Sequence, residues 1–174
     1  MNTSGFDIVV IGSGVIGHSI AFRLKQDAPQ LKIAVLGDPV NSLQASRAAA
    51  GMLSPFCECD RADRFFDFCR ESLNKFPEFL KELVSVSEVP VHFSSEGSLM
   101  PSSSYQETWE ERKAFFASED VPHEIWSAEK VRQKAPYLSE DCGEVMWVRE
   151  GQVNNRQMHD ALMRASKNMG IRVL

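Results

Sequence analysis

Three glycines with the spacing Gly-x-Gly-x-x-Gly, at Gly12, Gly14 and Gly17, carry the clearest chemical signal in the sequence. Gly12 permits a tight turn, Gly14 has no Cβ and lets backbone approach a pyrophosphate, and Gly17 lets the following helix pack closely. The N-terminus of such a helix offers unpaired N–H groups and a partial positive charge, which suit a diphosphate. The motif therefore predicts a dinucleotide-binding turn, with a purely structural turn as the alternative.

The residues on either side of the glycines predict the elements that would hold this turn. Residues 8–11 form a short apolar run, which suits a strand buried in a parallel sheet, and residues 15–24 carry apolar side chains at helical spacing. Residues 32–36 predict a second parallel strand, which a right-handed crossover places beside the first. The start of the chain therefore predicts a βαβ unit of the dinucleotide-binding kind.

The end of the second strand has two open interpretations. An acidic residue about 20 positions past the glycines normally accepts hydrogen bonds from the ribose hydroxyls. The strand here ends in Gly37 and Asp38, so Asp38 is the candidate, one position late. Since Asp before Pro39 is itself a turn signal, the alternative is that these residues form only a turn.

Residues 42–55 form a run rich in small side chains. Such a run leaves backbone amides uncovered, so a flat or anionic ligand can lie against the main chain. The alternative is the start of a small-residue helix that packs under another element. Arg47, within the run, is placed to approach a phosphate or the ring of a bound cofactor, or else is an exposed, solvated arginine.

The strand, the glycine turn and the block at residues 48–53, followed by Glu58 and residues 63–68, resemble the N-terminal half of glycine oxidases. These belong to the D-amino-acid oxidase group of FAD-dependent amine oxidoreductases. The likeness resumes at residues 126–129 and 150–154, so it covers nearly the whole chain. It implies FAD rather than NAD. One departure is that the family usually has Glu where Gly37 stands, which leaves Asp38 as the substitute.

The resemblance and the glycine motif together give the set of residues expected to bind the cofactor. They are Gly12, Gly14, Val15, Ile16, Gly17, Gly37, Asp38, Ala45, Ser46, Arg47, Ala50, Gly51 and Met52.

No catalytic residue is assigned. The resemblance implies transfer of a hydride from the carbon beside a substrate nitrogen to the flavin, a step that requires no protein acid or base. The four histidines, His18, His92, His123 and His159, fall in separate predicted elements and are interpreted as surface or packing residues.

The middle of the chain predicts a separate lobe. Residues 60–84 have helical periodicity and a core-facing stripe of Phe65, Phe66, Cys69, Leu73, Phe76, Leu80 and Leu83. Pro77 is expected to kink or restart that helix. Further expected elements are strands at 90–93 and 97–100, a helix at 105–118, a helix from the Ser127 cap to Pro136, a strand at 145–148, a loop at 151–154, a helix at 156–168 and a strand at 171–174.

The predicted fold class is α/β: a partial doubly wound, Rossmann-type FAD-binding sheet with the start of an α+β substrate lobe. The expected divisions are an FAD-binding segment at 1–60, lobe elements at 61–150, and a return to the sheet at 151–174. A doubly wound sheet needs about five strands, and three are predicted here. The chain is therefore expected to need a complementing polypeptide. Either this chain is one subunit or proteolytic fragment of a split enzyme, or it was cut from a longer one.

Three functions follow as hypotheses. The first is an FAD-dependent oxidase or dehydrogenase of a small amine such as glycine, sarcosine or a D-amino acid, formed with the complementing chain. The second is a non-catalytic cofactor-binding subunit. The third, disfavoured by the block at residues 50–52, is an NAD-dependent dehydrogenase.

Composition excludes several other classes. The 174 residues carry a formal net charge of −5, and the 19 Lys and Arg are scattered, which argues against a nucleic-acid partner. A strand that begins within the first ten residues leaves no room for a signal peptide, and no run approaches the ~20 apolar residues of a membrane span, so a cytoplasmic protein is expected. The four cysteines lack a Cys-x-x-Cys pair and are interpreted as reduced thiols, without a metal site.

Overall fold

The computed structural model describes residues 5–38 and 45–174, and these form two compact units. The first unit contains the chain up to Gly51 together with Pro77–His92 and Val153–Leu174. The second contains Met52–Phe76 and Phe93–Gln152. The divisions expected at residues 60 and 150 remain a prediction about the complete fold.

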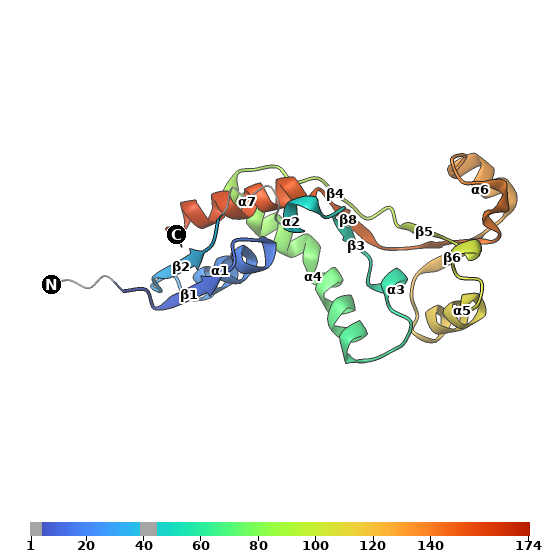
Figure 1. The fold of residues 1–174 in the computed structure, drawn as a ribbon, viewed down its shortest axis with the longest axis horizontal. Helices are drawn as coiled ribbons and strands as arrows, with labels where there is room; N and C mark the ends of the chain where they lie inside the picture. Colours follow the sequence, from blue (N-terminus) through green and yellow to red (C-terminus); the bar gives the residue numbers. More distant parts are fainter. Residues whose placement is uncertain (1–4, 39–44) are drawn as a thin grey trace. The chain divides into compact units, whose positions relative to one another are not determined.

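A three-stranded parallel sheet organises the first unit (Figure 1). Its order is β1 (Ile8–Ile11), β2 (Ile33–Leu36) and β9 (Arg172–Val173), with Ile8 opposite Ile33 and Val35 opposite Val173. Helix α1 (Val15–Asp27) packs on one face of the sheet, and α7 (Asn155–Asn168) packs against α1. This is the strand order of the first half of a doubly wound fold, so the predicted fold class is confirmed.

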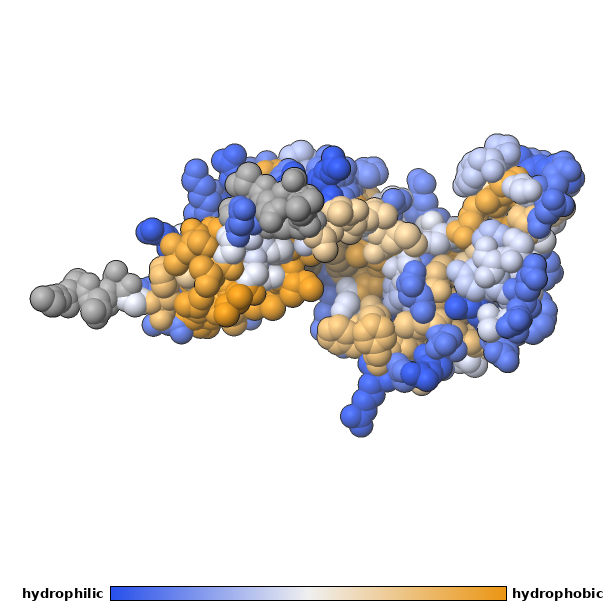
Figure 2. Space-filling model, in the orientation of Figure 1, coloured by the Kyte–Doolittle hydropathy of each residue, from blue (hydrophilic) through white to orange (hydrophobic). Residues whose placement is uncertain are grey.

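The buried side of this sheet follows from the alternation of the strands. Ile33 and Val35 are buried together with Ala21 of α1 and Ile171, and Ile8 and Val10 pack against them. The alternate residues of β1 point the other way: Val9 is 51% exposed and Ile11 84% exposed. Figure 2 shows hydrophobic surface gathered over β1 and α1. This face of β1 is therefore apolar and uncovered within the described part of the chain, whereas Ala34 of β2, which is paired with Val9, is buried.

Helix α4 (Arg64–Ser87) runs through Pro77 as one continuous helix, so it does not restart there as one interpretation had it. The division between the two units falls at Pro77. Phe66, Leu80 and Leu83 are buried, as the periodicity predicted. Phe65 was wrongly placed in the core: it is 66% exposed, because one helical step of about 100° turns it away from the side on which Phe66 packs.

The second unit is built on two small antiparallel sheets. One has the order β5 (Ser98–Pro101), β7 (Val145–Val148) and β6 (His123–Trp126), and the other β3 (Met52–Leu53), β8 (Gly151–Val153) and β4 (Phe93–Ser94). The remaining elements are α3 (Pro55–Glu58), η1 (Ser102–Ser104), α5 (Trp109–Ser118), α6 (Ala128–Lys134) and η2 (Glu140–Cys142).

The sequence interpretation of this unit was right for the longer elements and wrong for short ones. Ser127 caps α6 by accepting a hydrogen bond from the Lys130 amide, as expected. The loop predicted at 151–154 is instead strand β8, since Gln152 pairs with Met52 and Gly151 with Leu53. Strand β3 was not predicted because two residues carry no periodicity, and β6 was not predicted because it begins with His123 and Glu124 and lacks the apolar run that signals β7.

Candidate dinucleotide-binding site

The glycine turn leads from β1 directly into the N-terminus of α1. The Gly12 amide donates to the Leu36 carbonyl at 2.8 Å, which holds the turn to the end of β2. Gly14 is the N-cap residue of α1, no side chain of its own caps the helix, and the first turn contains no acidic residue. Val15 and Ile16 are the first two residues of that helix. This end of α1 therefore presents positive potential without a competing carboxylate.

Gly17 is required by close contact between the helix and the turn. A Cβ at Gly17 would lie 1.9 Å from the Gly12 carbonyl oxygen, and the 3.5 Å separation from Val10 Cγ1 shows how closely the helix approaches β1. No side chain fits in that space. The role predicted for this glycine, close packing of helix and sheet, agrees with the contact.

The small-residue segment meets the start of α1 through Ser46. This residue lies in the short helix α2 (Ala45–Ala48), and its Oγ accepts a hydrogen bond from the Val15 amide at 3.0 Å. A Cβ on Gly14 would lie 2.8 Å from the same Oγ. Segments separated by about 30 positions in the chain thus form two sides of one site, and Ala45 stands at the start of the second side.

Gly37 lies against the glycine turn. Its φ is +153°, and a Cβ there would lie 3.0 Å from both the amide nitrogen and the Oγ of Ser13. A side chain at this position would require Ser13 to shift. Asp38 follows and is exposed, so its contact with a ribose remains a prediction. Pro39, which completes the alternative turn, lies outside the described residues.

Arg47 contacts α7, and 32% of its side chain is exposed. Its guanidinium forms an ion pair with Asp160 at 2.9 Å and lies 3.4 Å from His159 Nδ1.

The predicted site residues 50–52 follow Arg47 in the chain. Ala50 is exposed, and the Gly51 carbonyl accepts a hydrogen bond from the Val153 amide at 2.9 Å. Met52 belongs to the second unit, where it lines an apolar groove of about 520 Å³ with Phe65 and Phe68.

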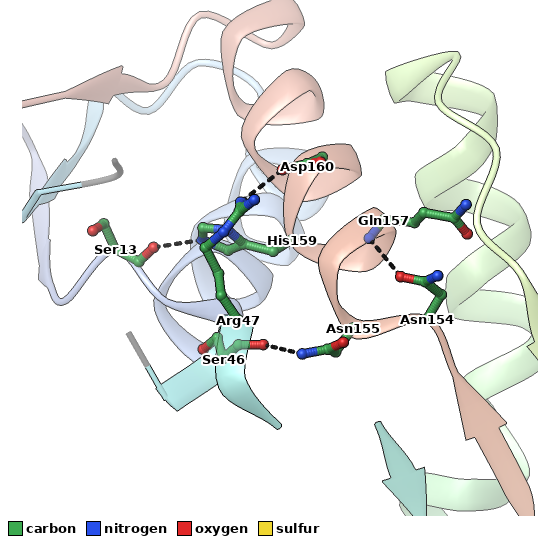
Figure 3. Close-up of polar contacts among 8 residues, drawn as sticks. All are labelled: Ser13, Ser46, Arg47, Asn154, Asn155, Gln157, His159 and Asp160. Carbon is green, nitrogen blue, oxygen red and sulfur yellow. Dashed lines mark hydrogen bonds and ion pairs between the residues drawn. The ribbon is translucent and has the colours of Figure 1, made fainter. Parts of the chain in front are cut away.

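Two residues of α7 that the sequence interpretation did not assign to the site contact it directly (Figure 3). Asn155 Nδ2 donates to the Ser46 carbonyl at 2.8 Å, and His159 Nε2 lies 2.9 Å from the Ser13 carbonyl. His159 is fully buried. Polar side chains at i and i+4 on the inward face of an amphipathic helix were the available signal.

A second buried histidine, His18 of α1, lies beside His159 with ring centroids 5.9 Å apart. Its Nδ1 is 2.9 Å from Ser166 Oγ. Burial, and secondarily the nearby His159, lower the pKa of His18 from 6.5 to about 4. The neutral ring is therefore the form that the folded unit contains near neutral pH.

The shifted pKa of His18 predicts a specific dependence of stability on pH. Below about pH 6.5 the unfolded chain binds a proton at this ring and the folded chain does not, so stability falls as pH falls toward about 4. The slope is at most about 1.4 kcal/mol per pH unit. Urea unfolding at several pH values should show this contribution, and His18→Gln should remove it. An unchanged pH dependence in that variant would contradict the prediction.

The fold and the turn define a class: an α/β protein that begins with the strand, glycine turn and helix of dinucleotide-binding folds. The comparison with protein families then gives the particular family. The model of the FAD-dependent oxidoreductase family DAO matches residues 7–174, and this chain belongs to that family. Its cofactor is FAD, as the resemblance implied, and the hypothesis of an NAD-dependent dehydrogenase is set aside.

Curated relatives support the family. Over 170 residues the chain is 28% identical to the glycine oxidase of Bacillus subtilis, covering 97% of this chain and 44% of that protein. It is 29% identical over 175 residues to the bifunctional protein ThiO/ThiG of Synechocystis, covering 96% of this chain and 24% of the relative. The chain thus spans less than half the length of these relatives.

Solved structures share the fold. The crystal structure of glycine oxidase from Geobacillus kaustophilus matches with a TM-score of 0.86 at 21% identity, over 97% of this chain and 46% of that one. An L-α-glycerophosphate oxidase from Mycoplasma pneumoniae with FAD bound matches with a TM-score of 0.79 at 14% identity, over 97% and 44% of the two chains. At these identities the likeness establishes the architecture alone.

Two further observations concern the described residues. No helix among them is both long and apolar enough to cross a membrane. The four cysteines, Cys57, Cys59, Cys69 and Cys142, are free thiols.

Proposed function

We propose that this chain is the FAD-binding half of an oxidoreductase that oxidises a small amine or amino acid of the glycine, sarcosine or D-amino-acid type. FAD, when bound, supplies the acceptor for the hydride that leaves the carbon beside the substrate nitrogen. The observation that carries the proposal is the N-terminus of α1, where Gly14 lies against Ser46 and the first helical turn contains no acidic side chain.

The residues of the first unit fit the diphosphate of FAD. The amides at Gly14 and Ile16 lie at the positive end of α1 and are proposed to hold that anion, while the Val15 amide donates to Ser46 Oγ and Gly12 and Gly17 shape the turn. Ser46 is proposed to form the second side of the site and Gly37 to let β2 end close to the turn. Asp38, Ala45, Arg47, Ala50, Gly51 and Met52 complete the proposed set.

A complementing polypeptide is part of the proposal. Val9 and Ile11 leave an apolar face of β1 uncovered, and within the described residues β1 pairs with β2 alone. In a doubly wound sheet the strands after the third are added on the free side of the first. The greater length of the curated relatives agrees with this arrangement. We propose that another chain or fragment covers this face, as one subunit of a cytoplasmic hetero-oligomer, and brings most of the substrate site.

An absorbance spectrum of the purified protein tests the proposal. Flavin bands at about 370 and about 450 nm are expected, together with their loss when a small amine is added without oxygen. If the bands are present but no glycine, sarcosine or D-amino acid bleaches them even with the complementing polypeptide, the chain is a non-catalytic cofactor-binding subunit. A colourless complete complex, reconstituted with excess FAD, would contradict the proposed function.

Gly14→Val is expected to abolish flavin retention. The added side chain would start 2.8 Å from Ser46 Oγ and would cover the amides at the start of α1. We expect FAD binding to weaken by about 100-fold or more, which corresponds to about 2.7 kcal/mol. Fluorescence titration with FAD measures this. Gly5→Val, at a position with no atom within 4 Å of the added Cβ, is the control. Retention of the yellow colour in Gly14→Val would refute the assigned role of the turn.

A further inference from the structure

Helix α7 makes a polar contact with each side of the proposed FAD site (Figure 3). Asn155 donates to the Ser46 carbonyl at 2.8 Å, and His159 contacts the Ser13 carbonyl at 2.9 Å. These two residues, termed the α7 pair, stand four positions apart and therefore share one face of the helix. They come from a part of the chain more than 100 positions beyond the glycine turn.

The partners of His159 determine its tautomer. A carbonyl oxygen only accepts hydrogen bonds, so Nε2 carries the proton that is donated to Ser13. A guanidinium only donates, so Nδ1 faces Arg47 as an unprotonated acceptor. These two partners therefore favour the tautomer with the proton on Nε2. Asp160 holds the Arg47 guanidinium in place with an ion pair of 2.9 Å.

Holding the Ser13 carbonyl also orients the next amide. A trans peptide is planar, so the carbonyl of Ser13 and the N–H of Gly14 point in opposite directions. With the carbonyl directed at His159, the Gly14 N–H points away from α7. On the other side of the site, Asn155 donates to the Ser46 carbonyl, and the Ser46 hydroxyl accepts a hydrogen bond from the Val15 amide. Both contacts thus act on groups that form the start of α1.

We propose that the α7 pair, Asn155 and His159, are positioning residues that hold the glycine turn and the Ser46 segment in the arrangement that receives the FAD diphosphate. This inference rests on the proposed function. It assigns a cofactor-related role to a helix whose residues were interpreted only as packing. Neither residue takes part in the reaction, since each acts through the backbone of Ser13 or Ser46.

The test compares His159→Leu with His159→Gln in the chain as isolated, with any polypeptide that copurifies. Leucine removes both polar atoms, whereas the glutamine amide can donate to Ser13 and its oxygen can accept from Arg47. We expect His159→Leu to weaken FAD binding about tenfold and His159→Gln by no more than about twofold. The phosphorus-31 resonances of bound FAD should shift in the leucine variant alone. Ser166→Ala, which removes the hydrogen bond of the neighbouring His18, is the matched control and should leave FAD affinity unchanged.

A second measurement needs no flavin. Nitrogen-15 resonances of the histidine ring report which nitrogen carries the proton, and the Nε2–H tautomer is expected for His159. Amide resonances of Gly14 and Val15 should move in His159→Leu and not in Ser166→Ala. If wild type fails to bind FAD, the proposed function fails, and these resonances still decide the positioning role. An Nδ1–H tautomer, unmoved amides, or wild-type FAD affinity in His159→Leu would overturn the inference.

Discussion

Gly17→Ala should destabilise the first unit by about 3 kcal/mol, the upper end of the range for added atoms in a packed site. The new Cβ would lie 1.9 Å from the Gly12 carbonyl oxygen, which belongs to the backbone and cannot rotate away. Alanine gains about 1 kcal/mol over glycine in helix propensity, which is too little to offset the clash. Urea unfolding followed by circular dichroism measures the change.

Gly5→Ala is the matched control for that experiment. No atom lies within 4 Å of a Cβ at Gly5, so its effect should stay within about 0.5 kcal/mol. If Gly17→Ala were as stable as Gly5→Ala, the close approach of α1 to the turn would be wrong. Gly14→Val should differ from both, because it obstructs the amides while only displacing a serine hydroxyl.

Glu150→Ala should destabilise the second unit by about 3–5 kcal/mol. The Glu150 carboxylate is 2% exposed and accepts hydrogen bonds from the Phe56 and Cys57 amides at 2.7 and 2.8 Å. Alanine would leave both buried amides unsatisfied, at about 1–3 kcal/mol each, and would add a cavity. Burial and a hydrogen bond from its thiol to Glu150 also raise the pKa of Cys57. The free energy of unfolding in urea is the measurement.

Glu150→Gln separates the hydrogen bonds from the bulk of the side chain. Its amide oxygen still accepts from both backbone amides, so we expect about half the loss seen with alanine. Glu107→Ala, at an exposed position, should change stability by less than about 0.5 kcal/mol. Equal stability of Glu150→Ala and Glu107→Ala would show that the carboxylate does not hold α3.

The sequence predicted the first unit well because its signals are local. Residues 8–17 carry a β-branched strand, three glycines and the start of a helix, and the structure contains these elements in that order. The βαβ unit followed from them, whereas the family and FAD followed from the resemblance carried chiefly by residues 48–53. The sequence also showed Gly37 at a position where the family usually has Glu, and in the structure a Cβ at Gly37 would lie 3.0 Å from the Ser13 amide nitrogen and Oγ.

What the sequence did not predict depends on contacts between distant segments. His18 and His159 are 141 positions apart in the sequence, and only the packing of α7 on α1 brings their rings together. Likewise, β8 becomes a strand because Gln152 meets Met52, which no local pattern signals. The exposure of Phe65 shows a further limit: periodicity marks an apolar stripe but not its edge.

Native mass spectrometry of the complex purified under non-denaturing conditions tests the central claim most directly. The account predicts one species that contains this 19.5 kDa chain, a second polypeptide and one FAD, with the FAD lost in Gly14→Val. A folded species of the chain alone that takes up no FAD from an excess of the cofactor, with Val9 and Ile11 still uncovered, would contradict it.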